Sequence, residues 1–196
     1  MIATPATRSE PGHGARERIL GTAYELFSQR GIRDVGIDEL VKRAGVAKAT
    51  LYNHFSSKDE LVLAFLQQRE RIWTYGWVEK EARQRGATPE EQLLAIFELF
   101  DEWFQGDDFE GCSFINALLE VGDLDNPVGR ASADHLGNIR SVVGSLALEA
   151  GLRDPDAFAL SWHLLMKGSI VQAAEGDRDA AKRAQALGRL LIEQHR

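Results

Sequence analysis

The chain has 196 residues, one cysteine and a formal net charge of −7 at pH 7. This length is enough to bury a core as one large or two small domains. The single Cys112 excludes an internal disulfide and is typical of a reducing compartment. No apolar run approaches the roughly 20 residues of a membrane span, and the opening residues lack a signal-peptide pattern. The sequence therefore predicts a cytoplasmic protein with no membrane partner.

The charge is distributed unevenly along the chain. Residues 1–55 hold 8 Lys and Arg against 6 Asp and Glu, whereas residues 56–196 hold 15 against 24. Such asymmetry between the two parts suggests separate roles. A slightly basic first part can meet phosphate, and a strongly acidic body is unsuited to that role.

In chain order, residues 1–14 contain Pro5, Pro11, Gly12 and Gly14 without hydrophobic periodicity, which predicts a disordered arm. An amphipathic helix is expected over residues 15–30, with an apolar stripe and Gly31 as its stop.

Two short helices with a tight turn are predicted between Ile37 and Lys58. Leu40, Val41 and Ala44 share one face of the first helix, and Gly45 ends it in the left-handed conformation. The second helix begins near Lys48 and points Leu51 and Phe55 inward. Its outward face carries small, hydroxyl, amide and cationic side chains. That combination is typical of a helix that reads the DNA major groove.

The remaining helices follow from their start and stop signals. Ser57 and Thr88 each begin a capping box, and the helix after Ser57 is expected to run to about Arg85. Prolines after Asn126 and Asp154 mark two further starts, and Asp179 begins the last helix. We predict an all-α protein with nine helices in two domains, divided as a 1–14 arm, a 15–60 helix-turn-helix domain and a 61–196 ligand-binding and dimerisation domain.

Several segments of the first 61 residues also resemble a known family. Residues 18–27, 30–31, 37–40, 44–55 and 58–61 closely resemble the DNA-binding domain of TetR-family transcriptional regulators. One departure is Gly36, where the family usually has a Ser or Thr that caps the helix and often touches a phosphate. Glycine is a weaker cap, so no DNA contact is assigned there.

The resemblance implies which residues contact DNA. Lys48 and Ala49 would approach base edges, and Lys58 would hold a phosphate with help from the N–H groups at the start of its helix. Mixed base and phosphate contacts would come from Thr50, Tyr52, Asn53 and His54.

The sequence predicts a one-component regulator, in particular a repressor that binds a palindromic operator as a homodimer and is released by a small apolar or aromatic effector. One recognition helix reads too few base pairs to specify a site in a genome, so two copies of the chain are expected to pair symmetrically on the operator. Stripes on the last two helices predict a four-helix interface, made by Phe158, Trp162, Leu165, Ser169, Ala184, Leu187 and Leu191.

The density of aromatic rings in the body predicts an effector pocket. Its candidate residues are Trp73, Trp77, Phe97, Phe100, Trp103, Phe104, Phe114, Asn116, Glu120, Trp162, His163 and Met166. An ionised Glu120 facing the pocket would favour cationic effectors, whereas dominance of Asn116 and His163 would favour neutral or phenolic ones. Asn116 and Glu120 as a simple hydrogen-bonded pair, and His163 as a core histidine, remain open.

Two alternatives from other functional classes remain. The body can instead be a docking surface for a protein partner without any cavity. An enzyme built on Cys112 would need a base such as His135 or His163, but nothing in the spacing supports either. No metal-ligand cluster, Gly-rich phosphate loop or cofactor motif is present in the sequence, so we expect no enzyme activity, metal or cofactor.

Overall fold

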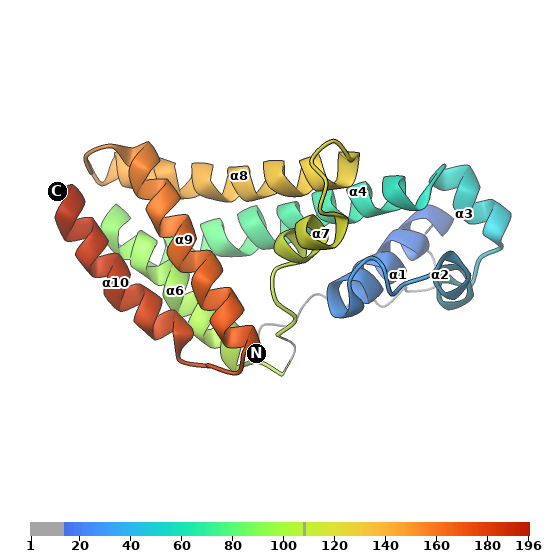
Figure 1. Cartoon of the computed structure of the whole chain (residues 1–196), viewed down its shortest axis with the longest axis horizontal. Coiled ribbons are helices and arrows are strands. Elements are labelled where there is room, and N and C mark those ends of the chain that lie inside the picture. Colours follow the sequence, from blue (N-terminus) through green and yellow to red (C-terminus); the bar gives the residue numbers. More distant parts are fainter. Residues whose placement is uncertain (1–13, 108) are drawn as a thin grey trace. The chain divides into compact units, whose positions relative to one another are not determined.

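The computed structural model describes residues 14–107 and 109–196, and these are helices joined by short loops without a strand (Figure 1). The predicted arm therefore falls outside the described residues, apart from Gly14. Nine helices are present in the described part if the uninterrupted run from Lys58 to Arg85 counts as one, which confirms the all-α prediction. The elements are α1 (Ala15–Arg30), α2 (Ile37–Ala44), α3 (Lys48–His54), α4 (Lys58–Arg69), η1 (Glu70–Glu79), α5 (Lys80–Arg85), α6 (Pro89–Gln105), α7 (Ser113–Val121), α8 (Pro127–Glu149), α9 (Pro155–Ala174) and α10 (Ala180–His195).

The chain folds into two compact units. Described residues up to 70 pack with residues 112–135, which include α7, and we call this the N-terminal unit. Residues 71–111 and 136–196 form the second unit, which we call the body. Because the N-terminal unit also contains residues 112–135, the predicted functional division at residue 60 stays a prediction.

Helix boundaries follow the expected local signals. Gly45 ends α2 at φ 63°, in the left-handed region that glycine adopts without a steric penalty. The hydroxyl of Ser57 accepts the Glu60 N–H at the start of α4. Thr88 and Glu91 form the reciprocal capping box of α6, with Pro89 as its first residue. Local side-chain chemistry thus fixes where these helices begin and end.

The middle of the long helix was not predicted correctly in its detail. An ordinary α-helix was expected over residues 58–85, but η1 is a π-helix of 10 residues. Such wide turns are rare and occur frequently at functional sites. Within η1, Trp73, Thr74 and Val78 are buried, while Tyr75 is exposed.

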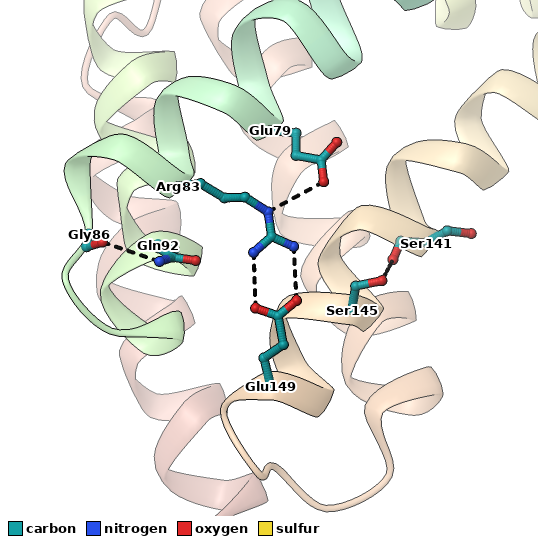
Figure 2. A network of polar contacts seen from close by, with 7 residues as sticks. All are labelled: Glu79, Arg83, Gly86, Gln92, Ser141, Ser145 and Glu149. Carbon is teal, nitrogen blue, oxygen red and sulfur yellow. Dashed lines mark hydrogen bonds and ion pairs between the residues drawn. The ribbon is translucent and has the colours of Figure 1, made fainter.

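The body is held by apolar packing and by a bidentate ion pair. Helix α10 packs against both α9 and α6, and α9 and α10 lie side by side in Figure 1. Figure 2 shows Arg83 of α5 donating through both terminal nitrogens to the Glu149 carboxylate of α8, at 2.9 Å each. The Glu149 hydrogen bonds and charge raise the pKa of Arg83. Because both side chains are at least a third exposed, the pair contributes modestly to stability and mainly fixes geometry.

None of the helices within the described residues is long and apolar enough to cross a membrane.

Candidate nucleic-acid interface

The helix-turn-helix of α2 and α3 is built on a fully buried apolar seam. Leu40, Leu51 and Phe55 are at most 1% exposed, and Ala44 is also buried, as the hydrophobic periodicity predicted. Burial of each large side chain stabilises the domain by about 1.5–3 kcal/mol. The Phe55 ring also lies under the Arg16 guanidinium, 5.0 Å from the ring centroid, so α1 is fixed against the end of α3.

The opposite face of α3 is open to solvent. Lys48, Ala49, Asn53 and His54 are exposed, and Tyr52 retains 43% of its surface. Thr50 is half-buried. A short helix that buries Leu51 and exposes these polar groups presents a row of donors and acceptors that can reach base edges and phosphates.

Two cations of the helix-turn-helix are paired with neighbouring acids. Lys48 Nζ lies 2.9 Å from Asp38 Oδ1 of α2, and this hydrogen bond and charge raise the pKa of Lys48. Arg43 similarly pairs with Glu25 at 2.7 Å. These pairs are largely exposed and individually weak. A DNA phosphate or base can therefore replace the carboxylate at little energetic cost.

Lys58 has a different environment from the one expected of a free phosphate-binding lysine. Its Nζ donates to the Ile32 carbonyl at 2.6 Å, in the turn between α1 and α2. Burial lowers the pKa of Lys58, while the negative charge of Glu120 acts in the opposite direction. One of its three N–H donors is thus occupied within the chain, and the other donors can still reach a phosphate.

The twelve pocket candidates fall in both units. Phe114, Asn116 and Glu120 belong to the N-terminal unit, and the others belong to the body. Phe114 is buried, with its ring 5.1 Å from that of His135, whereas Asn116 is exposed. Glu120 does not form part of an apolar pocket wall, because its carboxylate accepts the backbone N–H groups of Ile32 and Arg33.

In the body, the predicted rings form one continuous network across η1, α6 and α9. Trp73 contacts Trp77, Phe100 and Trp103, with ring centroids 5.4–5.9 Å apart. Phe97 bridges from Phe100 to Trp162, whose ring centroid is 5.1 Å away. The candidates Phe104 and Met166 are also buried. The rings that the sequence analysis grouped by their density therefore lie together on these three elements, and an effector pocket among them stays a prediction.

Three buried polar atoms near this network have no hydrogen-bonding partner among the described residues. They are Thr74 Oγ1, Trp162 Nε1 and His163 Nδ1. Burial lowers the pKa of His163 to about 3, and the positive charges of Lys167 and Arg140 lower it further in the same direction. His163 is thus a neutral core histidine at pH 7. An unpaired buried polar atom costs about 1–3 kcal/mol, so each of these atoms lowers the stability of the packing around it.

The predicted dimer residues do not all face outward. Phe158, Trp162, Ser169 and Ala184 are buried within the chain's own packing, because α9 and α10 pack on each other and on α6. Trp162 lies so close to Gly188 that a Cβ there would be 2.9 Å from its ring. Leu165 and Leu191 are half-buried, and Leu187 is 52% exposed. The predicted interface residues therefore lie mostly on the buried faces of α9 and α10, and most of the exposed apolar residues lie on other faces of these helices.

Those exposed residues were missed by the sequence reasoning. Leu160, Leu164 and Val171 share a face of α9 and are 58%, 71% and 48% exposed. On α10, Leu190 is 61% exposed beside the exposed Leu187. The i, i+4 and i+11 spacing of Leu160, Leu164 and Val171 could have identified this face from the sequence, but the stripe of Phe158 and Trp162 was chosen because its side chains are larger.

Other site types find no support within residues 14–107 and 109–196. There, no group of three or more His, Cys, Asp or Glu side chains is arranged to hold a metal ion. Cys112 is buried at the start of α7.

Comparison with known proteins connects this geometry to a family. Residues 19–65 match the family model of bacterial regulatory proteins of the tetR family. The crystal structure of SCO4454, a TetR-family transcriptional regulator from Streptomyces coelicolor, superimposes with a TM-score of 0.83 at 31% identity, over 92% of this chain and 95% of that one.

Two curated relatives are similar over shorter segments. The transcriptional repressor NemR of Escherichia coli is 29% identical over 71% of this chain and 69% of its own length. The transcriptional activator FasR of Mycolicibacterium smegmatis is 37% identical over 50% of this chain, and that match spans only 43% of FasR. With the helix-turn-helix geometry and the near-full-length match to a TetR-family structure, the chain belongs to the TetR family and is a DNA-binding transcriptional regulator, not an enzyme.

Proposed function

We propose that this regulator is a repressor that binds a palindromic operator as a homodimer and leaves it when a small apolar or aromatic molecule binds the body. The observation that supports DNA binding is that α3 has one buried and one exposed face: Leu51 is completely buried, whereas Lys48, Tyr52 and Asn53 are exposed. Binding to operator DNA would place the protein in the cytoplasm. The relatives include a named repressor and a named activator, and repression follows the one that aligns over more of both chains.

The DNA-contact proposal is tested by selecting bound sequences from random duplex DNA and then measuring variants on the selected operator. Tyr52→Ala is expected to weaken operator binding by about 1–3 kcal/mol if it removes a base contact. Lys58→Ala is expected to weaken unrelated duplexes and to reduce the salt slope by about one. It should weaken the selected operator at least as much, because Lys58 also holds the Ile32 carbonyl in the turn before α2. Unchanged operator affinity of a folded Lys48→Ala/Tyr52→Ala variant would show that α3 is not the reading helix.

The homodimer is supported by the exposed apolar face of α9 and α10. Leu160, Leu164 and Val171 of α9 and Leu187 and Leu190 of α10 are exposed on two helices that pack on each other. Monomers seldom leave a large apolar patch in water. Two copies related by a two-fold axis would bury it as a four-helix interface. This placement replaces the buried stripe that the sequence suggested.

Leu164→Glu tests the interface directly. The variant is expected to sediment as a monomer at micromolar concentration and to lose operator binding, because a buried unpaired carboxylate is costly. Leu124→Glu is the matched control, since Leu124 is 59% exposed in the loop before α8 and outside this face. A wild-type chain that is monomeric under the same conditions contradicts the homodimer.

The effector proposal is supported by the ring network and its unpaired polar atoms. Thr74, Trp162 and His163 offer neutral donors and acceptors beside apolar surface, a combination that suits a small organic molecule. The alternative of a cationic effector depended on a Glu120 carboxylate that faces the pocket. It loses its support, because this carboxylate accepts hydrogen bonds from backbone N–H groups. We therefore propose a neutral or phenolic effector.

Titration of tryptophan fluorescence with a chemically diverse compound set, in parallel with operator release, tests this proposal. A genuine effector must change both signals, because a ligand with equal affinity for two conformations shifts neither population. If compounds change neither signal, the alternative of a body that docks a protein partner replaces the effector proposal.

A further inference from the structure

The turn between α1 and α2 is gripped by a carboxylate from a distant helix. Glu120, in the last turn of α7, accepts the Ile32 N–H at 2.8 Å through Oε2 and at 3.1 Å through Oε1. Its Oε2 also accepts the Arg33 N–H at 2.8 Å. Hydrogen bonds to an ionised acceptor are roughly twice as strong as neutral ones. Two consecutive amides that follow the end of α1 are therefore satisfied by one side chain 87 or 88 residues away.

Gly31 makes this approach sterically feasible. It has φ 80°, and a Cβ at this position would lie only 2.3 Å from Glu120 Oε1. No side chain can occupy that space while the carboxylate is in place. The glycine thus serves both the backbone conformation and the close approach of Glu120.

Lys58 grips the same turn through the opposite backbone group. Its Nζ donates to the Ile32 carbonyl at 2.6 Å, so both the N–H and the C=O of Ile32 are bonded to charged side chains. Lys58 is the first residue of α4, and α4 packs against α7 within the same unit. The turn is therefore fixed between α4 and α7, and it leads directly into α2 of the helix-turn-helix.

We propose that Glu120 is a positioning residue for operator recognition, which holds the α1–α2 turn so that α2 and α3 are presented in the orientation that specific DNA requires. This inference rests on the proposed function and names a route for its regulation. Movement of α7 would loosen or shift the turn, and the recognition helix would follow. Glu120 itself need not touch DNA for its loss to reduce specific binding.

The test compares Glu120→Ala and Glu120→Gln with Leu119→Ala, an exposed neighbour on the same helix, in the full-length protein. Three measurements are needed: affinity for the operator selected by the wild type, affinity for an unrelated duplex, and hydrogen exchange at the amides of Ile32 and Arg33. Glu120→Ala is expected to weaken operator binding about tenfold or more, the range that corresponds to lost hydrogen bonds to a charged group, and to leave unrelated duplex binding within about twofold. Amide exchange at both positions should accelerate.

Glu120→Gln provides the conservative rescue. Its carbonyl oxygen can still accept from the two amides, so operator affinity is expected to recover to within a few-fold of the wild type. If Glu120→Ala is too unstable to measure, accelerated exchange and an intermediate operator affinity in Glu120→Gln support the same proposal. Wild-type operator affinity in Glu120→Ala, despite faster exchange at Ile32 and Arg33, overturns it. A wild-type chain that selects no DNA sequence refutes the proposed function itself, and the positioning role fails with it.

Discussion

The buried imidazole of His163 makes a quantitative prediction about acid stability. In the folded chain the side chain is 3% exposed, and its pKa is lowered to about 3, first by burial and then by Lys167 and Arg140. An unfolded chain has the ordinary histidine pKa of about 6.5. Above pH 6.5 both states hold the ring neutral, and the group has no effect on stability. Below that pH the unfolded state gains a proton that the folded state refuses, so the free energy of unfolding falls as the pH falls.

The magnitude follows from linkage. Each pH unit between about 6.5 and 3 costs about 1.4 kcal/mol, so the wild type is expected to lose about 2 kcal/mol between pH 7.5 and pH 5 through this residue. His163→Leu lacks the titrating group and should lose less by about that amount. Because Nδ1 has no partner among the described residues, the substitution breaks no hydrogen bond of that atom at pH 7.5.

Urea denaturation at pH 7.5 and pH 5 of the wild type and His163→Leu measures the difference, at one protein concentration because association affects apparent stability. Carboxylates such as Glu149 and Glu102, whose pKa values are lowered by Arg83 and Arg85, remain ionised across this window. They therefore contribute little to the comparison. Equal losses for the two proteins would refute the placement of a neutral imidazole in the core.

Two further predictions concern the recognition helix and the π-helix. Asp38→Asn removes the acid that pairs with Lys48. It is expected to tighten operator binding, measured by fluorescence anisotropy, by about 1.4- to 5-fold per half-site, which is the equivalent of one exposed ion pair. Unchanged or weaker binding counts against a DNA contact by Lys48. Gly76→Ala would place a Cβ 2.9 Å from the Arg71 carbonyl oxygen in η1, so it is expected to lower the melting temperature by a few degrees and to change tryptophan fluorescence. Its control, Gly144→Ala, meets only the Ala159 Cβ at 3.8 Å and should be neutral or stabilising.

The features that could be predicted from the sequence are those with a local cause. Gly45, Ser57 and Thr88 act within one helical turn, and they correctly placed helix ends. The periodicity that points Leu51 and Phe55 inward is equally local and was confirmed. Phe97, Phe100 and Phe104, which the sequence analysis named only as pocket candidates, are all buried on α6.

The predictions that failed or changed depend on which face meets which neighbour. Phe158 and Trp162 form the most apolar stripe of α9, and it was assigned to a partner subunit although α6 and α10 of the same chain cover it. Periodicity identifies an apolar face but does not say what packs against it. Leu160 and Leu164 are as apolar as the buried residues of α9, and only the three-dimensional packing shows that these two leucines are left exposed.

Polar side chains were the hardest to place, since their roles depend on single atoms far apart in the sequence. Glu120 on an apolar helix suggested a pocket acid, yet its partners are the backbone amides of Ile32 and Arg33. A carboxylate that satisfies N–H groups lowers the cost of its own burial and theirs, and no periodic pattern reveals backbone donors. The close approach at Gly31 was a usable signal in principle, but the sequence alone assigned that glycine only to the end of α1.

The same pairing changes what the basic character of the DNA-binding end means. Lys48 and Arg43 are already matched by Asp38 and Glu25, and these pairs are exposed. Their carboxylates weaken the long-range attraction that the cations alone would exert on DNA. When a phosphate displaces a carboxylate, one ionic contact is exchanged for another, and the net gain per cation is small. In the proposed operator complex, discrimination between operator and other DNA would therefore come mainly from the fit of Tyr52, Asn53 and their neighbours to base edges. The orientation of α3, and the turn proposed to fix it, would then matter more than the number of lysines.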